Sequence, residues 1–383
     1  MYKKTESTMV FTEEPEKELW RSLLQYSYRA NIKRYFDENN IAYEETGGSE
    51  SQLDNICNSV AGALLQADEY FKASKVVSLQ VEPLLLYYGT TNLLFALYVL
   101  ITGQVPVITN HGMRIEIEKT HEYIADTKVY FNHSADGGIH KFVNCLGLSI
   151  DLCNYPNWNL VDFLDSIAEI RDDFERCYQD RQSKVIPLNV VDTPEGIVEK
   201  IYVDDESIQK IVDSIEGFST AYLRPQRVQG RNAEVYYVLR HKMNGADIQQ
   251  ISYSGQPYLQ VAHEKNSQLL TIAKELNMYV SLFALGSMCR YHPEIWNPFV
   301  TQDSTGEKLL VEKLLYYSRR ILPNIVLNRI RNRQVTFVSD KYSPESRIHL
   351  VGEHEVKEIV SNEVRKQIKQ EQAENLLQGR RLR

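Results

Sequence analysis

The chain has 383 residues, of which 43% are hydrophobic and 25% charged, and its formal net charge is −8. This length predicts two or three domains with a sizeable core. The acidic balance excludes a surface coated throughout in phosphate-binding charge, but it leaves room for a local basic groove. The cysteines lack a CxxC pair and zinc-ligand spacing, so we expect free thiols in a reducing cytosol and no metal site; they are Cys57, Cys145, Cys153, Cys177 and Cys289.

The first residues predict a disordered start over 1–15 that lacks the apolar stretch of a secretory signal, so we expect a cytoplasmic protein. Residues 16–39 then predict an amphipathic helix, with Leu19 and Leu23 on its apolar stripe and Trp20 as an anchor. Residues 44–51 indicate a loop. Residues 53–75 repeat apolar side chains at helical spacing and predict a second helix.

The segment from Pro83 to Met113 contains no Asp, Glu, Lys or Arg. Pro83 suits a first helical turn and Gly103 suits a C-cap, so we expect a helix over 84–102. The segment is long enough to span a bilayer. Its internal polar residues and the absence of flanking basic clusters favour a buried core helix instead, and no membrane association is expected.

The texture changes between Lys128 and His263, where short β-branched or aromatic runs are bounded by turn residues. We predict an α+β insert with a small, mainly antiparallel sheet, interrupted by helices near 160–179 and 205–215. Helices resume over 266–291 and 309–332, with Pro323 as a kink or break.

The predicted fold class is therefore α+β, mainly α. The predicted divisions are a disordered start (1–15), a helical bundle in two parts (16–127 and 264–332), the insert (128–263), and a strand, turn and charged C-terminal helix (333–383).

Several short motifs follow one another in a distinctive order: FK at 71–72, LLLYYG at 84–89, NLLFAL at 92–97, NHG at 110–112 and RYHPEIW at 290–296. This order resembles the YaaC-like proteins, a bacterial family without a settled activity, from Trp20 to about Pro323. The tandem aromatics, Asn and Ala of one helix, followed by Gly, Pro and His-Gly, also look like the helical core of HEPN proteins. That resemblance implies a HEPN-like bundle, in a superfamily of antiviral and toxin RNases and of non-catalytic binding modules.

The HEPN resemblance directs attention to Arg114 and His121, because HEPN nucleases carry an Arg followed four to six residues later by a His. The imidazole would move the ribose 2′-hydroxyl proton, and the cation would hold the developing phosphate charge. On a helix, seven positions make about two turns, so both side chains would share a face. The intervening Glu116 and Glu118 would repel a phosphate, and an ordinary charged helix face is the alternative.

His111 follows the uncharged segment, and its imidazole is expected to meet polar groups of Tyr87, Tyr88 or Asn92. One interpretation is a buried histidine that is satisfied by its neighbours and fixes the turn. The other is that His111, with Asn110 beside it, binds or positions a ligand.

The motif RYHPEIW predicts a structural corner, because Pro293 disfavours helix at His292. Trp296 is expected to pack back onto the preceding helix, and Arg290 to cap its carbonyls or pair with Glu294. The alternative is that this corner belongs to a site.

Basic residues gather after Tyr316 and Tyr317 and are candidates to follow a nucleic-acid backbone, the alternative being a solvated helix face; they are Arg319, Arg320, Arg329, Arg331 and Arg333. The chain has no GxxxxGK[ST], GxGxxG, HExxH or GxSxG motif. The usual ATPase, dehydrogenase, zinc-protease and serine-hydrolase classes therefore lose support, and no cofactor is expected.

The resemblances imply a nucleic-acid- or nucleotide-linked module of a bacterial defence or stress system, in one form a metal-independent HEPN-type RNase. In an RNase of this type, Arg114 would stabilise the phosphate charge, His121 would act as the acid and base, and His111 would have a positioning role. The alternative is a non-catalytic scaffold that binds a protein partner or itself, since HEPN-like bundles often associate through helices. The expected partners are RNA or a nucleotide, or a protein of a defence complex, and a homo-oligomer is expected.

Overall fold

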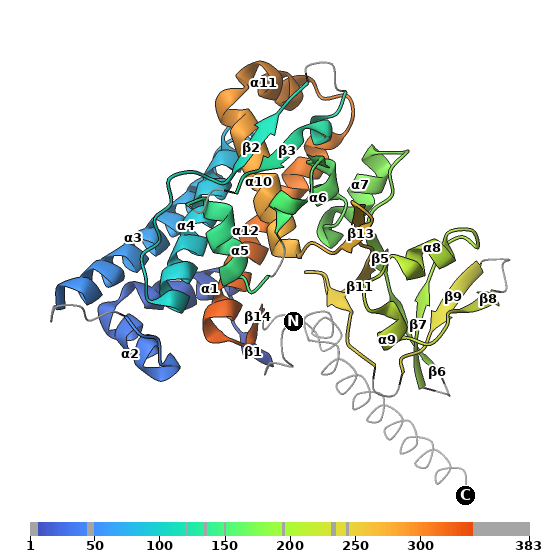
Figure 1. The fold of residues 1–383 in the computed structure, drawn as a ribbon, viewed down its shortest axis with the longest axis horizontal. Helices are drawn as coiled ribbons and strands as arrows, with labels where there is room; N and C mark the ends of the chain where they lie inside the picture. The colour runs from blue at the N-terminus through green and yellow to red at the C-terminus, as the bar shows by residue number, and fades with distance from the viewer. Residues whose placement is uncertain are drawn as a thin grey trace, which may run out of the picture.

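The computed structural model describes residues 7–43, 50–118, 122–133, 136–148, 151–193, 196–230, 235–242 and 245–339. Within them the chain is mainly helical with several small sheets, which confirms the α+β, mainly α class (Figure 1). The loop predicted at 44–51 lies almost wholly outside the described residues, and the helix predicted at 356–383 lies entirely outside them.

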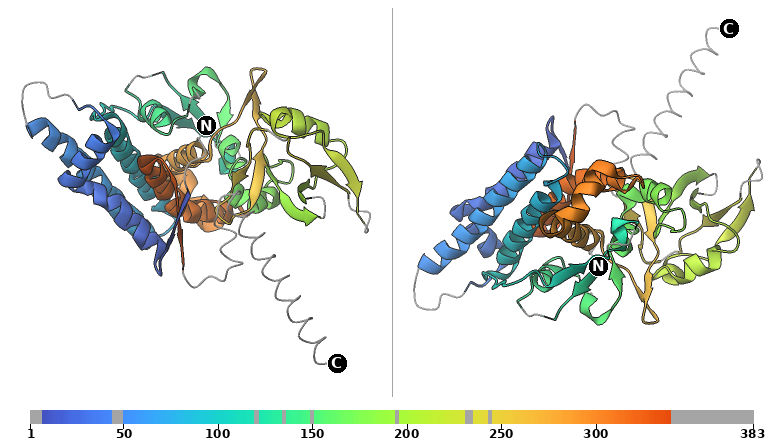
Figure 2. Two further views of the ribbon diagram at one scale, coloured as in Figure 1. Left: turned by 90° about the horizontal axis from the view of Figure 1, so that it is seen from below. Right: turned by 90° about the horizontal axis from the view of Figure 1, so that it is seen from above.

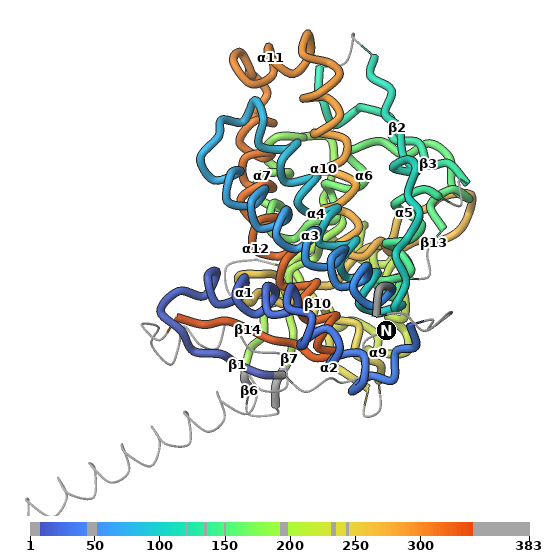
Figure 3. The backbone as a smooth tube through the Cα atoms, turned by 90° about the vertical axis from the view of Figure 1, so that its left-hand side faces the viewer, coloured from blue at the N-terminus to red at the C-terminus, as the bar shows by residue number. Residues whose placement is uncertain are grey.

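The N-terminal segment folds more than predicted. Ser7–Phe11 forms strand β1, which pairs in parallel with β14 (Gln334–Val338), so these residues correct the disordered start expected over 1–15. Figure 3 shows the two strands side by side beneath the helices. The single helix predicted over 16–39 is divided into α1 (Pro15–Leu24), a 3₁₀ turn η1 (Gln25–Ser27) and α2 (Arg29–Asn39). The Ser27 hydroxyl donates to Leu24 O at 2.7 Å, a local bond that competes with helix continuation.

Helix α4 (Glu82–Thr102) lies in the middle of the helical part, in agreement with the helix predicted over 84–102. It packs against α3 (Glu50–Ser74), α10 (Lys274–Tyr291) and α12 (Glu307–Arg331). Gly89 permits the close approach to α3, because a Cβ there would lie 2.7 Å from the Phe71 ring. Of the described helices, α4 alone is long and apolar enough to cross a membrane, yet side chains such as Leu93 and Leu97 are wholly buried in the main core.

Two boundaries of the later helices differ from the prediction. Helix α10 begins at Lys274 rather than near 266, because β12 (His263–Lys265) and β13 (Gln268–Leu270) form a hairpin first. Asn266 and Ser267 both have positive φ, which suits a two-residue hairpin turn. Helix α11 (Pro293–Gln302) follows α10, and α12 continues through Pro323 without a break.

The remaining elements attached to the helical part are short. Strands β2 (Met113–Glu116), β3 (Lys128–Phe131) and β4 (Trp158–Asn159) form an antiparallel sheet. Around it lie helices α5 (Gly138–Cys145), α6 (Val161–Leu164) and α7 (Arg171–Cys177). Single-turn 3₁₀ helices complete this part: η2 (Ile124–Asp126), η3 (Leu152–Asn154) and η4 (Ala168–Ile170).

A second, smaller core lies to one side of the helices (Figures 1 and 2). One sheet has the order β10-β11-β5 and the other β6-β7-β9-β8, and all their described pairs are antiparallel. The first comprises β5 (Val185–Pro187), β10 (Gln250–Ile251) and β11 (Pro257–Gln260). The second comprises β6 (Asn189–Thr193), β7 (Gly196–Ile201), β8 (Gln226–Gln229) and β9 (Val235–Leu239), with helices α8 (Ile208–Asp213) and α9 (Phe218–Ala221).

This second core is shorter than the insert predicted over 128–263. Its buried side chains run from Leu188 to Val261, whereas Val129 and Tyr178 belong to the main core. Residues 129–178 therefore extend the helical part, and the change of core comes about sixty residues later than the change in sequence texture suggests.

Candidate functional site

The turn at 110–112 follows α4 in the chain and lies against the first turn of α5. Asn110 O accepts from Gly138 N at 2.9 Å, and His111 O accepts from Ile139 N at 3.1 Å. Asn110 Oδ1 also accepts from Gly112 N at 2.8 Å. Gly112 has φ +75°, and a Cβ there would lie 2.6 Å from Ile139 Cγ2. Only glycine fits both the conformation and the space, so the turn holds His111 in a fixed place.

The imidazole of His111 meets one of its expected partners. Its Nδ1 lies 2.7 Å from the Tyr87 hydroxyl, and the rings of Tyr87 and Phe283 lie 5.4 Å and 5.7 Å from its own. Partial burial of the ring, and then the nearby Arg290 charge, lowers the pKa of His111 and so favours the neutral imidazole, which shares one hydrogen bond with the Tyr87 hydroxyl. The residue as a whole is exposed, and Nε2 has no hydrogen-bond partner among the described residues. The interpretation as a buried, fully satisfied histidine is therefore wrong.

Two other members of the predicted group, Tyr88 and Asn92, have hydrogen-bond partners other than His111. The Arg290 guanidinium donates to the Tyr88 hydroxyl, which joins α10 to α4. Asn92 donates to Gln66 Oε1 on α3 at 3.2 Å, so its amide is engaged away from the His111 turn. The turn is thus supported by Tyr87 and the aromatic side chains of α10, and not by Asn92.

Arg114 lies on strand β2, which corrects the expectation that it shares a helix with His121. Its guanidinium carbon is 4.2 Å from the centre of the Tyr130 ring, and Tyr130 is its partner in the β2–β3 register. This cation–π contact occupies the cation in a structural role. His121 lies outside the described residues, so the pair itself stays untested.

The motif at 290–296 forms a corner between two helices. Helix α10 ends at Tyr291, His292 departs from helical geometry with φ −130° and ψ 55°, and α11 begins at Pro293. Trp296 is 1% exposed and packs on Phe299 with ring centroids 5.0 Å apart.

Arg290 was expected either to cap the last carbonyls of α10 or to pair with Glu294, and its observed side-chain partner is a tyrosine. Arg290 contacts Tyr88, while His292 Nδ1 lies 3.6 Å from Glu294 Oε1.

The five arginines between residues 319 and 333, which lie along and just beyond α12, do not form a single stripe. Arg319 pairs with Glu82 Oε1 at 2.5 Å, and Arg329 Nε donates to Cys145 O at 3.0 Å. These two hold α4 and α5 against α12. Arg320 and Arg331 are eleven residues apart, about three helical turns, so they share a face. Arg333 is exposed beyond the end of the helix.

Two adjoining cavities lie between α12 and the sheet of the second core. The Arg320 cavity has a volume of about 200 Å³, and its polar lining includes Lys274, Arg320, Asn324 and Asn328. The Gln256 cavity has a volume of about 410 Å³, and its polar lining includes Glu169, Asn189, Ser254, Gln256 and Lys313. Ser252 borders both cavities. Tyr253 of the first and Tyr317 of the second have ring centroids 5.9 Å apart.

An ion pair connects the walls of the two cavities. Lys274 Nζ lies 3.1 Å from Glu169 Oε1, which also accepts from Tyr253 N at 2.8 Å. Burial acts to lower the pKa of Lys274, but the Glu169 charge outweighs it and the pKa is raised, so this lysine stays charged. Glu169 Oε2 is buried and has no hydrogen-bond partner among the described residues. An unpaired buried carboxylate oxygen favours an N–H or O–H donor beside it.

Comparison with known proteins gives one match. The family described as "YaaC-like Protein" matches residues 22–330, which is most of the chain. The chain belongs to the YaaC-like family. No curated protein and no solved structure matches it. The likeness to HEPN proteins is without such support and stays a prediction.

The matched range of this YaaC-like chain contains α4, the turn at 110–112, α10 and all of the lining of the Gln256 cavity. The β14 residues of the Arg320 cavity lie beyond it. Sequence reasoning did not identify Lys274 or Glu169. Lys274 falls inside the longer helix predicted over 266–291, and Glu169 belongs to an acidic stretch of the sequence. The turn around Gly255, which presents Tyr253 and Gln256, was visible as a break between strand-like runs.

Proposed function

We propose that this YaaC-like protein binds a nucleotide across the two adjoining cavities and acts as a nucleotide-linked module. The observation that carries the proposal is the placement of two groups on either side of Lys274. One is Arg320, which has no ion-pair partner among the described residues, and the other is the unpaired Glu169 Oε2. A nucleotide offers a phosphate to the first and base N–H groups to the second. A setting in bacterial defence or stress is implied by the family resemblance.

The Arg320 cavity suits the phosphate. Arg320 and Lys274 both line it, and a guanidinium matches phosphate oxygens with two parallel hydrogen bonds. Asn328 accepts from Val335 N at 2.8 Å through its oxygen, so its NH₂ group remains a donor beside them. Three donor-bearing side chains thus converge on a small cavity.

The Gln256 cavity suits the base. Glu169 Oε2 accepts an amino or imino N–H, and Asn189, Ser254 and Gln256 offer amide and hydroxyl groups of both hydrogen-bonding types. Tyr253 and Tyr317 lie at the junction, where an aromatic ring stacks on a base or sugar.

Calorimetric titration of the purified chain with guanosine, adenosine and uridine monophosphates tests this function. We expect Arg320→Gln to weaken binding by roughly 10- to 100-fold, because a charged hydrogen bond contributes about 1.5–3 kcal/mol. The matched control is Arg331→Gln, since Arg331 shares the helix face but lines neither cavity. Asn189→Ala should reduce the preference between bases with less effect on inorganic phosphate. Equal losses in the two arginine variants, or no nucleotide binding by the wild type, would refute the proposal.

The ribonuclease form of this function stays a separate prediction. Arg114 stacks on Tyr130 and would have to leave it to hold a phosphate. RNA cleavage without metal, compared between the wild type and His121→Ala, tests it. Equal cleavage by both proteins, or cleavage by neither, would remove the catalytic pair. Association with a protein partner or with a second copy likewise stays a prediction.

A further inference from the structure

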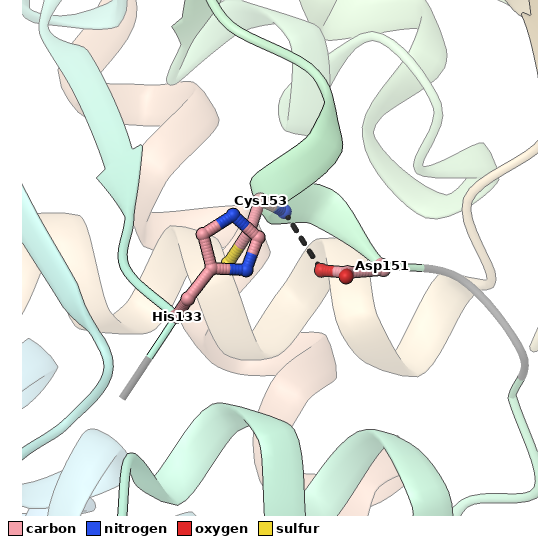
Figure 4. Close-up of side chains that lie close together, drawn as sticks. All are labelled: His133, Asp151 and Cys153. Carbon is pink, nitrogen blue, oxygen red and sulfur yellow. Dashed lines mark hydrogen bonds between the residues drawn. The ribbon is translucent and has the colours of Figure 1, made fainter. Parts of the chain in front are cut away.

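A group of metal-ligating side chains lies beside the turn at 110–112, away from the two cavities. His133 follows strand β3, and Asp151 and Cys153 belong to the η3 turn and its start. One donor atom from each of these three residues lies within 4.8 Å of the others. Figure 4 shows the His133 ring next to the Cys153 sulfur, with the Asp151 carboxylate on the other side of the Cys153 backbone.

The donor set has the chemistry of a zinc site. Imidazole nitrogen, thiolate sulfur and carboxylate oxygen are the ligands that Zn²⁺ takes, at about 2.0–2.3 Å in tetrahedral geometry. Such bonds place neighbouring donor atoms about 3.3–3.6 Å apart. The three donor atoms lie within 4.8 Å of one another, so the separations would have to shorten to that spacing when an ion binds, mainly by movement of the exposed His133 ring.

The surrounding hydrogen bonds orient the donors. Asp151 Oδ1 accepts from Cys153 N at 3.0 Å, and Oδ2 accepts from Asn154 Nδ2 at 3.2 Å, which fixes the carboxylate and leaves a lone pair on each oxygen. His140 Nε2 lies 2.5 Å from Asn132 O, so this nitrogen carries the proton. The same nitrogen lies 3.8 Å from Cys153 Sγ, beside the sulfur. Metal sites use such outer partners to orient their ligands.

A second group of similar composition shows what a satisfied cluster looks like. Asp162, Asp165 and His263 also bring their donor atoms together. There Lys265 Nζ lies 3.1 Å from Asp162 Oδ2, and the Ser166 hydroxyl lies 2.7 Å from Asp165 Oδ1 and 3.0 Å from His263 Nε2. The protein itself neutralises and pairs that group. No lysine or arginine contact is found for His133, Asp151 or Cys153 among the described residues.

We propose that His133, Asp151 and Cys153 bind a divalent ion of the zinc class, with His140 orienting the sulfur. Zinc held by three protein ligands keeps a water molecule in its fourth position, and the exposure of His133 and Asp151 leaves that position open. The expectation of no metal site followed from the spacing of the cysteines and the absence of an HExxH motif. This group is instead spread over residues 133–153 from β3, α5 and η3, and matches no compact zinc motif.

Titration of the full chain with Co²⁺, followed by absorption spectroscopy, tests the proposal. We expect one equivalent to bind with a thiolate-to-cobalt charge-transfer band and tetrahedral ligand-field bands, both displaced by Zn²⁺. Cys153→Ser should abolish the charge-transfer band. The exposed His133→Gln should weaken binding at least 10-fold without loss of fold. His140→Ala should keep the band but weaken binding by roughly 10- to 100-fold, the effect of an outer partner.

Cys289→Ser is the matched control, because Cys289 is a half-buried thiol on α10 outside the group. It should retain the wild-type spectrum and affinity. Absence of the band in the wild type, its survival in Cys153→Ser, or an equal loss in Cys289→Ser would overturn the proposal. Circular dichroism of each variant verifies that the comparison is made between folded proteins.

Discussion

Replacement of Gly112 by alanine should destabilise the protein strongly, because the residue faces two separate restrictions. Its φ of +75° lies in the left-handed region, which costs an alanine about 1–2 kcal/mol. An alanine Cβ would also lie 2.6 Å from Ile139 Cγ2, well inside the optimum carbon separation of about 3.5–4.0 Å. Such overpacking typically costs about 1–3 kcal/mol. The sum predicts a loss of roughly 2–5 kcal/mol in the free energy of unfolding.

Two other glycines separate these contributions. Gly306 has φ +88° with no atom within 4 Å of an added Cβ, so Gly306→Ala should show the conformational cost alone. Gly62 lies in α3 at ordinary φ with open space around it, so Gly62→Ala should stabilise by about 0.5–1 kcal/mol.

Urea unfolding of the three variants measures these differences as changes in midpoint at constant slope. A loss in Gly112→Ala no greater than that in Gly306→Ala would refute the proposed contact with Ile139.

Two further predictions concern α4 and the turn. The Thr90 hydroxyl is buried without a hydrogen-bond partner among the described residues, whereas the Thr91 hydroxyl donates to Tyr87 O at 2.9 Å. In urea unfolding, Thr90→Val should therefore stabilise and Thr91→Val destabilise, each by about 1 kcal/mol, and equal effects would contradict this. Burial first, and then the Arg290 charge, lowers the pKa of His111 below 6.5, so its contribution to stability is present above pH 6.5 and lost as the pH falls through the lowered pKa. Arg290→Gln should raise that pKa in an NMR titration, and an unchanged value would exclude Arg290 as a cause.

The central helix was predictable because its determinants are local. Pro83 and Gly103 mark its ends, and the uninterrupted apolar sequence between them requires burial on every side. The same logic located α3 and the corner at Pro293. The same logic did not predict the division of the helix expected over 16–39. Its apolar spacing continues past Ser27, whose hydroxyl bonds to Leu24 O where the helix is interrupted.

Strand β2 was missed although its pattern was present. Met113, Ile115 and Ile117 alternate with charged residues, which is the period of a strand. The spacing of Arg114 and His121 also suits one face of a helix, but β2 shows that the strand period applies at Arg114. The strand also needs β3 for its hydrogen bonds, and β3 begins only at Lys128, twelve residues after β2 ends at Glu116.

Neither the cavities nor the His133 group could be located from sequence. Arg320, Lys274 and Glu169 belong to α12, α10 and η4, and only the packing of the second core against α12 brings them together. The His133 group likewise joins β3, α5 and η3 through the antiparallel sheet and the start of α5. The chemistry of each residue is visible in the sequence, but the distance between the residues is a product of tertiary structure.

The parallel pairing of β1 with β14 has a consequence for synthesis on the ribosome. The register joins Ser7 to Gln334, so more than 300 residues must be translated before the first strand finds its partner. At about 5–20 residues per second, this takes roughly 15–65 s. During that interval β1 exposes an unpaired edge, and the main core still lacks Val335 and Phe337 of β14. Closure of the native fold is therefore a late event in the synthesis of the chain, and a nascent chain stalled before residue 334 should remain open to chaperones and proteases.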